Sequence, residues 1–420
     1  MPMTLTRSVA HEAGFLQGIA LVLPITLAVM GVVVLAPDLP QLMAHFSDVP
    51  NADYWVPMIL TTPALCVAAF SAPAGWLGDR FGRRKLLIAS MTVYAAVGIA
   101  PFVLDNLDAI LMSRVGVGVC EAMVMTLSTT LIADFFEGGR RDRWLASQTA
   151  TASLSSLVLL NIGGALGVLG WRGPFLIYAS ALVMMAGVVL FTWEIKPGAG
   201  RQETAADDSA KIIFPWLRMS GICAVTIFAS VMFYTVQIET SVGLNDHGVV
   251  DPRALGWMTS IASLGVPVGT LIFRYVDRLS TSMLLLIEFV ILGGGFVGMG
   301  HTGSVNGFLA AAAINQVGAG MILPTLLTWA MRGLAYKIRG RGTGLWTASF
   351  SIGQFLCPLV ITGISRQTGG LLPSFRILGF ACFAAGMGAF VFMLSARRWQ
   401  SAGSNSVMPR ICDRDGKTTT

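Results

Sequence analysis

The chain has 420 residues, of which 54% are apolar and only 12% charged, and its mean hydropathy is +0.71. Soluble domains carry about 25% charged residues, so this composition excludes a soluble globular protein. The net charge of +6 therefore has to be interpreted for a chain whose main solvent is lipid.

Twelve apolar runs follow one another along the chain, each long enough to cross a bilayer as a helix, which takes about 20 residues. They lie at residues 15–35, 53–74, 86–104, 108–134, 147–170, 174–193, 219–238, 255–273, 282–300, 306–331, 343–364 and 374–395. The first run has no convincing small-residue cleavage site after it, so we predict a retained helix and not a signal peptide. The pattern predicts an all-α, multi-pass membrane protein with twelve transmembrane helices.

Lys and Arg residues are concentrated in alternate loops, and basic loops stay on the cytoplasmic side. With both termini placed in the cytoplasm, the basic residues that face the opposite side are Arg172, Arg253, Arg366 and Arg376. The positive charge thus reports topology and requires no nucleic-acid partner. We expect the chain to lie in the inner (plasma) membrane.

The longest polar interruption between helices divides the runs six and six. We predict an N-terminal half at residues 1–193, a cytoplasmic linker at 194–214, a C-terminal half at 215–396 and a flexible tail at 397–420. Asp79-Arg80 recurs as Asp277-Arg278, and Arg141-Asp142-Arg143 recurs as Arg339-Gly340-Arg341, both at an offset of 198 residues. Two matches at one offset indicate an internal repeat, which is typical of transporters with related halves around a central cavity.

A glycine-rich basic loop stands between the second and third runs. It reads Gly75-Trp-Leu-Gly-Asp79-Arg80-Phe-Gly82-Arg83-Arg84-Lys85. Glycines let helices approach closely and turn tightly, and the aspartate can bind an opposing helix N-terminus or an arginine. A plain positive-inside loop would need neither the glycines nor the aspartate at this spacing.

This loop resembles the signature loop of the major facilitator superfamily. The resemblance implies a fold of two six-helix halves that give access to each side of the membrane in turn. It also implies that Asp79 latches the cytoplasmic side in the outward-open state, facing the helix after Arg341, with Arg143 in the same charge network. Asp277 and Arg278 are the equivalents in the second half.

Other features look most like the drug and metabolite:proton antiporters of that superfamily, in particular the segment from Arg339 to Pro358. One departure concerns the fifth helix, where such antiporters usually carry Gly-Pro before Gly-Gly and this chain has Leu159-Leu-Asn-Ile-Gly-Gly164. We expect efflux and keep proton-driven uptake of an organic acid as the alternative.

Ionisable side chains at bilayer depth are costly and therefore mark functional candidates. Glu121 lies seven residues, about two turns, after Arg114 in the fourth run, so the two project from nearly the same face. An apolar cavity favours the neutral carboxylic acid, and an arriving substrate or arginine favours the carboxylate. We predict that Glu121 exchanges the coupling proton, with a buried structural cluster as the alternative, and that Arg114 binds substrate or anchors the helix. Glu288 is a second acid that we expect to be peripheral.

Amides inside the runs are candidates for orienting a ligand through paired donors and acceptors. Gln148 and Gln354 are assigned to the substrate cavity, although helix-to-helix hydrogen bonding explains such amides equally well. Only Gln354 gains support from the resemblance.

The chain has no Walker-type phosphate loop and no nucleophile elbow, so we expect transport driven by a gradient, and no enzyme activity. The predicted partners are a small-molecule substrate, protons and the lipid bilayer. We expect a monomer without cofactor or metal site. A receptor that has kept the fold without transporting is a remote alternative, because it should show an eroded signature loop.

Overall fold

The computed structural model describes residues 13–194, 214–332 and 334–405. Within these ranges it contains twelve helical segments that are long and apolar enough to span a membrane, as predicted. The N-terminal half consists of α1 (Phe15–Val22), α2 (Ile25–Val33), η1 (Ala36–Asp38), α3 (Leu39–His45), α4 (Ala52–Phe81), α5 (Arg83–Ile99), η2 (Ala100–Phe102), α6 (Leu107–Phe135), α7 (Gly138–Gly167), η3 (Gly173–Ala179) and α8 (Ser180–Phe191). The C-terminal half consists of α9 (Trp216–Asp246), α10 (Pro252–Ser263), α11 (Gly265–Val276), α12 (Thr281–His301), α13 (Val305–Met331), α14 (Tyr336–Thr368) and α15 (Leu371–Asn405).

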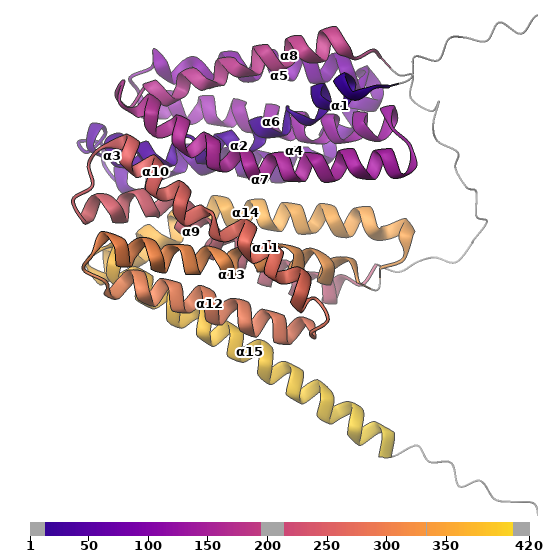
Figure 1. Ribbon diagram of the computed structural model, residues 1–420, viewed down its shortest axis with the longest axis vertical. Coiled ribbons are helices and arrows are strands. Elements are labelled where there is room, and N and C mark those ends of the chain that lie inside the picture. Colours follow the sequence, from indigo (N-terminus) through magenta and orange to yellow (C-terminus); the bar gives the residue numbers. More distant parts are fainter. Residues whose placement is uncertain (1–12, 195–213, 333, 406–420) are drawn as a thin grey trace, which may run out of the picture.

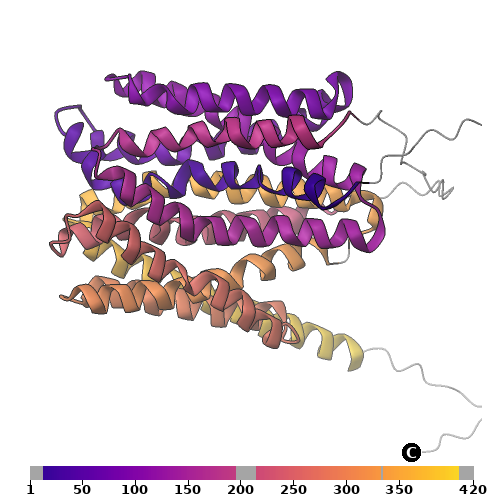
Figure 2. The same ribbon diagram turned by 45° about the horizontal axis from the view of Figure 1, so that its top comes forward.

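The two halves form two groups of roughly parallel helix axes lying side by side (Figure 1), and the turned view in Figure 2 shows the same division. We call the end of the bundle where α8 ends and α9 begins the linker end. The opposite end, where α7 ends and η3 begins, is called the far end. The beginning of α1 and the end of α15 both lie at the linker end (Figure 1), in keeping with an even number of spans.

Polar caps begin several spans, because the first N–H groups of a helix have no partner within it. Asn106 accepts a hydrogen bond from the backbone N–H of Asp108 at 2.8 Å at the start of α6. Asp251 and Ser304 cap α10 and α13 in the same way. Proline, which lacks this N–H, lies in the break between α1 and α2, where Pro24 directly precedes the first residue of α2, Ile25.

Each half has its own apolar core. One core packs around Leu27, Ile59 and Val117, and the other around Leu292, Phe296 and Phe308. Lipid is as apolar as these side chains, so the helices associate by close packing, which small residues promote. At Gly163 a Cβ atom would come within 2.1 Å of the carbonyl oxygen of Val34, which shows how closely α7 approaches the first span.

Two predicted segments, the linker and the tail, lie at the limits of the described residues. The linker, predicted at 194–214, falls almost wholly outside the described residues. Helix α15 continues to Asn405, so the region predicted as a flexible tail from residue 397 starts as helix, and 406–420 lie outside the described residues.

Candidate functional site

The signature loop is the turn from α4 into α5, and a single residue, Gly82, separates the two helices. Gly82 has φ = +95°, a conformation that side-chain-bearing residues rarely adopt. At Gly78 a Cβ atom would come within 2.4 Å of Leu127 Cδ2 on α6. The glycine spacing therefore serves a sharp turn and a close helix contact.

The charged residues of this loop bind within their own half. Arg83 donates to Asp79 at 2.7 Å and to Asp134, at the end of α6, at 2.5 Å. Arg143 is exposed on α7 and donates to the carbonyl oxygen of Gly139.

In the second half Asp277 and Arg278 follow α11, and Arg341 is exposed near the start of α14. The latch between Asp79 and the helix after Arg341 is implied by the resemblance for the outward-open state, and it stays a prediction.

One role at the linker end was missed from the sequence. Glu194, assigned to the linker, accepts the backbone N–H groups of Arg84 and Lys85 at 3.3 and 3.2 Å, and so caps α5. The Arg84 side chain donates to Thr192 and to the carbonyl oxygen of Val189. Glu194 and Arg84 thereby fasten the end of the sixth span to the start of the third.

Glu121 lies on α6 at the interface between the halves and is 6% exposed. Its Oε2 atom has no hydrogen-bond partner among the described residues and points at α2, since a Cβ atom on Gly31 would lie 3.4 Å from it. Glu121 also interacts electrostatically with Tyr234 of α9 in the other half. It is thus an incompletely satisfied acid where the two halves meet.

Arg114 is fully buried and faces away from that interface. Its guanidinium donates to the carbonyl oxygens of Val97 and Gly98 on α5 and lies 5.1 and 4.9 Å from the ring centroids of Phe175 and Tyr178 on η3. No ion pair joins Arg114 to Glu121 in the described part of the chain. These contacts fit the anchoring role, while Nη1 has no partner among the described residues, so substrate binding stays a prediction.

The two amides differ in their surroundings. Gln148 on α7 donates to Ser128 at 3.2 Å and accepts from Thr129 at 3.0 Å, both on α6. This is the helix-to-helix bonding that was the alternative to ligand binding. Gln354 on α14 is half-buried, and its assignment to the cavity stays a prediction.

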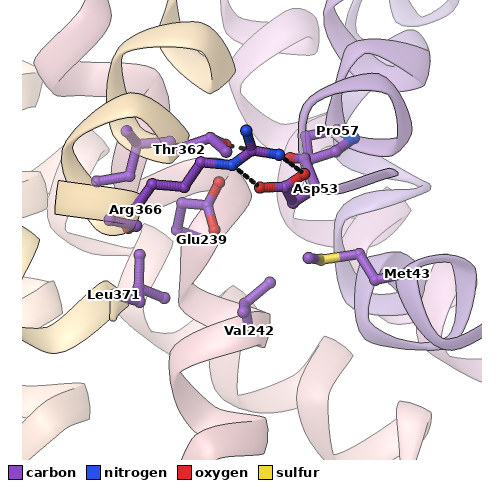
Figure 3. Close-up of a pocket in the computed structure, with 10 residues that line it drawn as sticks. Met43, Asp53, Pro57, Glu239, Val242, Thr362, Arg366 and Leu371 are labelled. Carbon is purple, nitrogen blue, oxygen red and sulfur yellow. Dashed lines mark hydrogen bonds and ion pairs between the residues drawn. The ribbon is translucent and has the colours of Figure 1, made fainter. Parts of the chain in front are cut away.

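At the far end the halves are joined directly. Arg366 of α14 donates to both carboxylate oxygens of Asp53 on α4, at 2.7 and 2.6 Å, and to Asn51 at 2.9 Å. Thr362 donates to the carbonyl oxygen of Asp53 at 3.1 Å. This bidentate contact lines a cavity of about 250 Å³ together with Glu239 of α9, as Figure 3 shows. Neither residue of the pair was predicted as a site residue, because one sequence does not show which distant residues meet.

A second junction at the far end is a backbone crossing between α7 and α10. A Cβ atom on Gly164 would lie 2.4 Å from the carbonyl oxygen of Pro252 and 3.0 Å from Gly256 Cα. Ser241 of α9 also donates to the carbonyl oxygen of Ala36 on η1. The far end of the interface is therefore closed.

Residues 21–249 match the family model described as Major Facilitator Superfamily, and this span is more than half of the chain. The chain belongs to the Major Facilitator Superfamily. Its members are membrane transporters and not enzymes, so this chain is a multi-pass membrane transporter. The expectation drawn from the signature loop is confirmed at the level of the superfamily.

Solved structures of this superfamily have the same fold at low sequence identity. A bacterial homologue of the human lysosomal transporter Spinster, in an inward-facing and unoccupied conformation, is 18% identical, with a TM-score of 0.71 over 89% of this chain and 94% of that one. The xylose transporter XylE from E. coli, in an inward open conformation, is 13% identical, with a TM-score of 0.68 over 90% and 96%. The MFS-type transporter ppzB of Metarhizium rileyi is 29% identical over 156 residues, which is 36% of this chain and only 32% of that protein.

Proposed function

We propose that this transporter exports a small organic molecule in exchange for protons. The linker end would face the cytoplasm of the inner membrane, because the signature loop and its repeat place their basic residues there and basic loops stay inside. The far end, closed between the halves, would face outward. The described conformation is then the inward-open state of an alternating-access cycle.

Exposed hydroxyls on α7 support access from the linker end. Ser147, Thr149 and Ser153 are exposed on the linker-end half of this spanning helix, whereas Leu160, Gly163 and Gly164 farther along it are buried. Polar side chains of a spanning helix usually face protein or a water-filled space and not lipid. The pattern favours an aqueous path that enters at the linker end and stops before the far end.

Glu121 carries the proposal of proton coupling. Its buried Oε2 has no partner in the described part of the chain, and its neighbours come from both halves. A carboxyl group in this position can be neutral in one conformation and ionised in the other, when the surrounding helices and substrate change. It would thus bind a proton in one state and release it in the next.

Uptake of an organic acid is the second candidate function. The Nη1 atom of Arg114, which has no hydrogen-bond partner among the described residues, is the observation in its favour, because guanidinium groups bind carboxylates with two parallel hydrogen bonds. Arg114 would then turn from the carbonyl oxygens of α5 toward substrate.

Proton flux in proteoliposomes tests the proposal. Purified wild type and Glu121→Gln are reconstituted with a pH-sensitive dye inside and challenged with hydrophobic cations, organic acids and natural products. We expect at least one compound to drive proton movement that Glu121→Gln abolishes. Movement of the compound away from the linker-end side with protons moving in the opposite direction indicates export. Movement of the compound and protons in the same direction indicates uptake.

Glu288→Gln is the matched control. Glu288 is also a fully buried acid on a spanning helix, but it accepts a hydrogen bond from Thr325 within its own half. Its variant should retain proton movement. Compound transport by wild type without any proton signal would contradict the proposed coupling.

A further inference from the structure

Glu239 is a second buried acid at the interface between the halves. It is 6% exposed, and no described residue donates a hydrogen bond to it or forms an ion pair with it. Its carboxyl group points into the far-end cavity toward the Asp53–Arg366 pair (Figure 3). An ionised carboxylate without a partner at this depth is costly, whereas the protonated acid is not.

Arg366 binds residues of the other half, whereas Glu239 belongs to the same half as Arg366. Asp53 and Asn51 belong to the N-terminal half, whereas Arg366 on α14 and Glu239 on α9 belong to the C-terminal half, where these two helices pack together. When the halves separate at the far end, Asp53 moves away from Arg366. Glu239 is the cavity-lining carboxylate that stays with Arg366.

None of the other described titratable groups near Glu239 is a cation directed at it: His247, next to Asp246 on α9, has its ring nitrogens at the carbonyl oxygens of Gly243 and Thr302. Asp246 on α9 and Cys357 on α14 interact with it electrostatically, and neither carries a positive charge. Asp38 on η1 is directed at Gly167 of α7. Arg253, at the start of α10, is exposed. Among the described cavity-lining residues, Arg366 is the cation that can pair with Glu239.

We propose that Glu239 is a proton-binding site that decides whether Arg366 keeps its bond to Asp53. With the proton bound, Glu239 is neutral, Arg366 stays on Asp53, and the far end is closed. When the proton leaves, Glu239 becomes a carboxylate, Arg366 transfers to it, and the far end opens. The inference rests on the proposed proton-coupled function and assigns the control of the outer gate to a residue other than Glu121.

The distance between two spin labels across the far end tests this assignment. Cysteines replace the exposed residues Val103 and Val250, one on each half, and Cys223 and Cys412 are changed to serine, since the other four cysteines are buried. Distances are measured by pulsed electron paramagnetic resonance in lipid nanodiscs from about pH 5 to about pH 8, the range in which a buried carboxyl group titrates. Wild type should shift toward longer distances as the pH rises.

Three variants distinguish the role of Glu239 from those of Asp53 and of another buried acid. Glu239→Gln should keep the short distance at every pH, because a neutral side chain cannot take Arg366 from Asp53. Asp53→Asn should give longer distances at every pH. Glu288→Gln, a buried acid away from this cavity, should respond as wild type does.

Two results would overturn the inference: a pH response that survives in Glu239→Gln, or a wild type with no pH response. Either can occur while substrate-driven proton flux persists, in which case the proposed function stands and only Glu239 is excluded. The absence of substrate-driven proton flux in wild type would instead contradict the proposed function on which the inference rests.

Discussion

At the far end Arg366 of one half binds Asp53 of the other, whereas at the linker end Arg83 binds Asp79 and Asp134 of its own half. The far end therefore has contacts that must break when the halves move, and the linker end has contacts that can persist. Close packing at glycines shows the same contrast, since Gly164 meets the backbone of Gly256 across the halves, while Gly78 meets the side chain of Leu127 within one half. The difference indicates which contacts define a conformational state and which merely hold a half together.

The largest effect is expected from Gly164→Leu. Its side chain would come closer to the backbone of α10 than van der Waals contact allows, and overpacking of this kind costs about 3 kcal/mol. If that cost falls on the far-end-closed state, the population ratio shifts about 100-fold toward the open state. The Val103–Val250 label distance should lengthen.

Gly187→Leu on α8 is the control for that substitution, because a Cβ atom there would meet nothing within 4 Å. Its label distance should match that of wild type. A short distance in Gly164→Leu would show that α7 and α10 do not hold the far end closed.

Arg114→Met should act on stability and leave the conformational state unchanged. The substitution removes hydrogen bonds from a buried guanidinium to the carbonyl oxygens of Val97 and Gly98, and we expect the free energy of unfolding to fall by about 2 kcal/mol. Thermal unfolding in detergent measures this loss, with the exposed Arg253→Met as control. Unchanged stability together with weaker substrate binding would instead assign Arg114 to the substrate.

Asp53→Asn should shift the far end toward the open state less than Gly164→Leu does. The Asp53 side chain is 37% exposed, and partly exposed ion pairs contribute little to stability because water competes for both charges. The rate at which a hydrophilic maleimide modifies Val242→Cys in the cavity should rise severalfold. Restoration of the slow rate by exchanging the two charges, in Asp53→Arg with Arg366→Asp, would confirm that the pair itself closes this end.

The smallest effect in the described conformation is expected from Asp79→Asn. Arg83 keeps its bond to Asp134 in this variant, and the Asp79 side chain is 55% exposed. A change of about twofold or less is expected in the population with the linker end open, measured by labels at Phe81→Cys and Leu217→Cys. A much larger shift toward the open state would reveal the latch that the superfamily resemblance implies for the outward-open state.

Sequence patterns predicted the twelve spans and the superfamily because long apolar runs and the spacing of Gly75, Gly82 and Asp79 are local properties. They did not predict the breaks at Leu23 and Leu264, where a short irregularity leaves the hydropathy of the span unchanged. The capping role of Glu194 was also missed, because its partners, the amides of Arg84 and Lys85, lie on a helix remote in sequence.

The candidate site shows the same limit. Spacing on one helix placed Glu121 and Arg114 on nearly the same face, but the long Arg114 side chain turns toward α5 and η3 and forms no ion pair with Glu121 within the described chain. Glu239 was not singled out from the sequence, and Arg366 was noted only for the topology, because both stand near a predicted span end, where charged residues are common. Their significance depends on which helices of the two halves meet, and that is a tertiary property.

Simultaneous distance measurements across both ends of the bundle test the central claim, that the halves open one end as they close the other. Wild type and Gly164→Leu carry labels either at Val103 and Val250 or at Phe81 and Leu217, in the same nanodiscs. We predict that Gly164→Leu lengthens the far-end distance and shortens the linker-end distance. Lengthening at both ends, or a linker-end distance that does not change, would contradict alternating access about this interface.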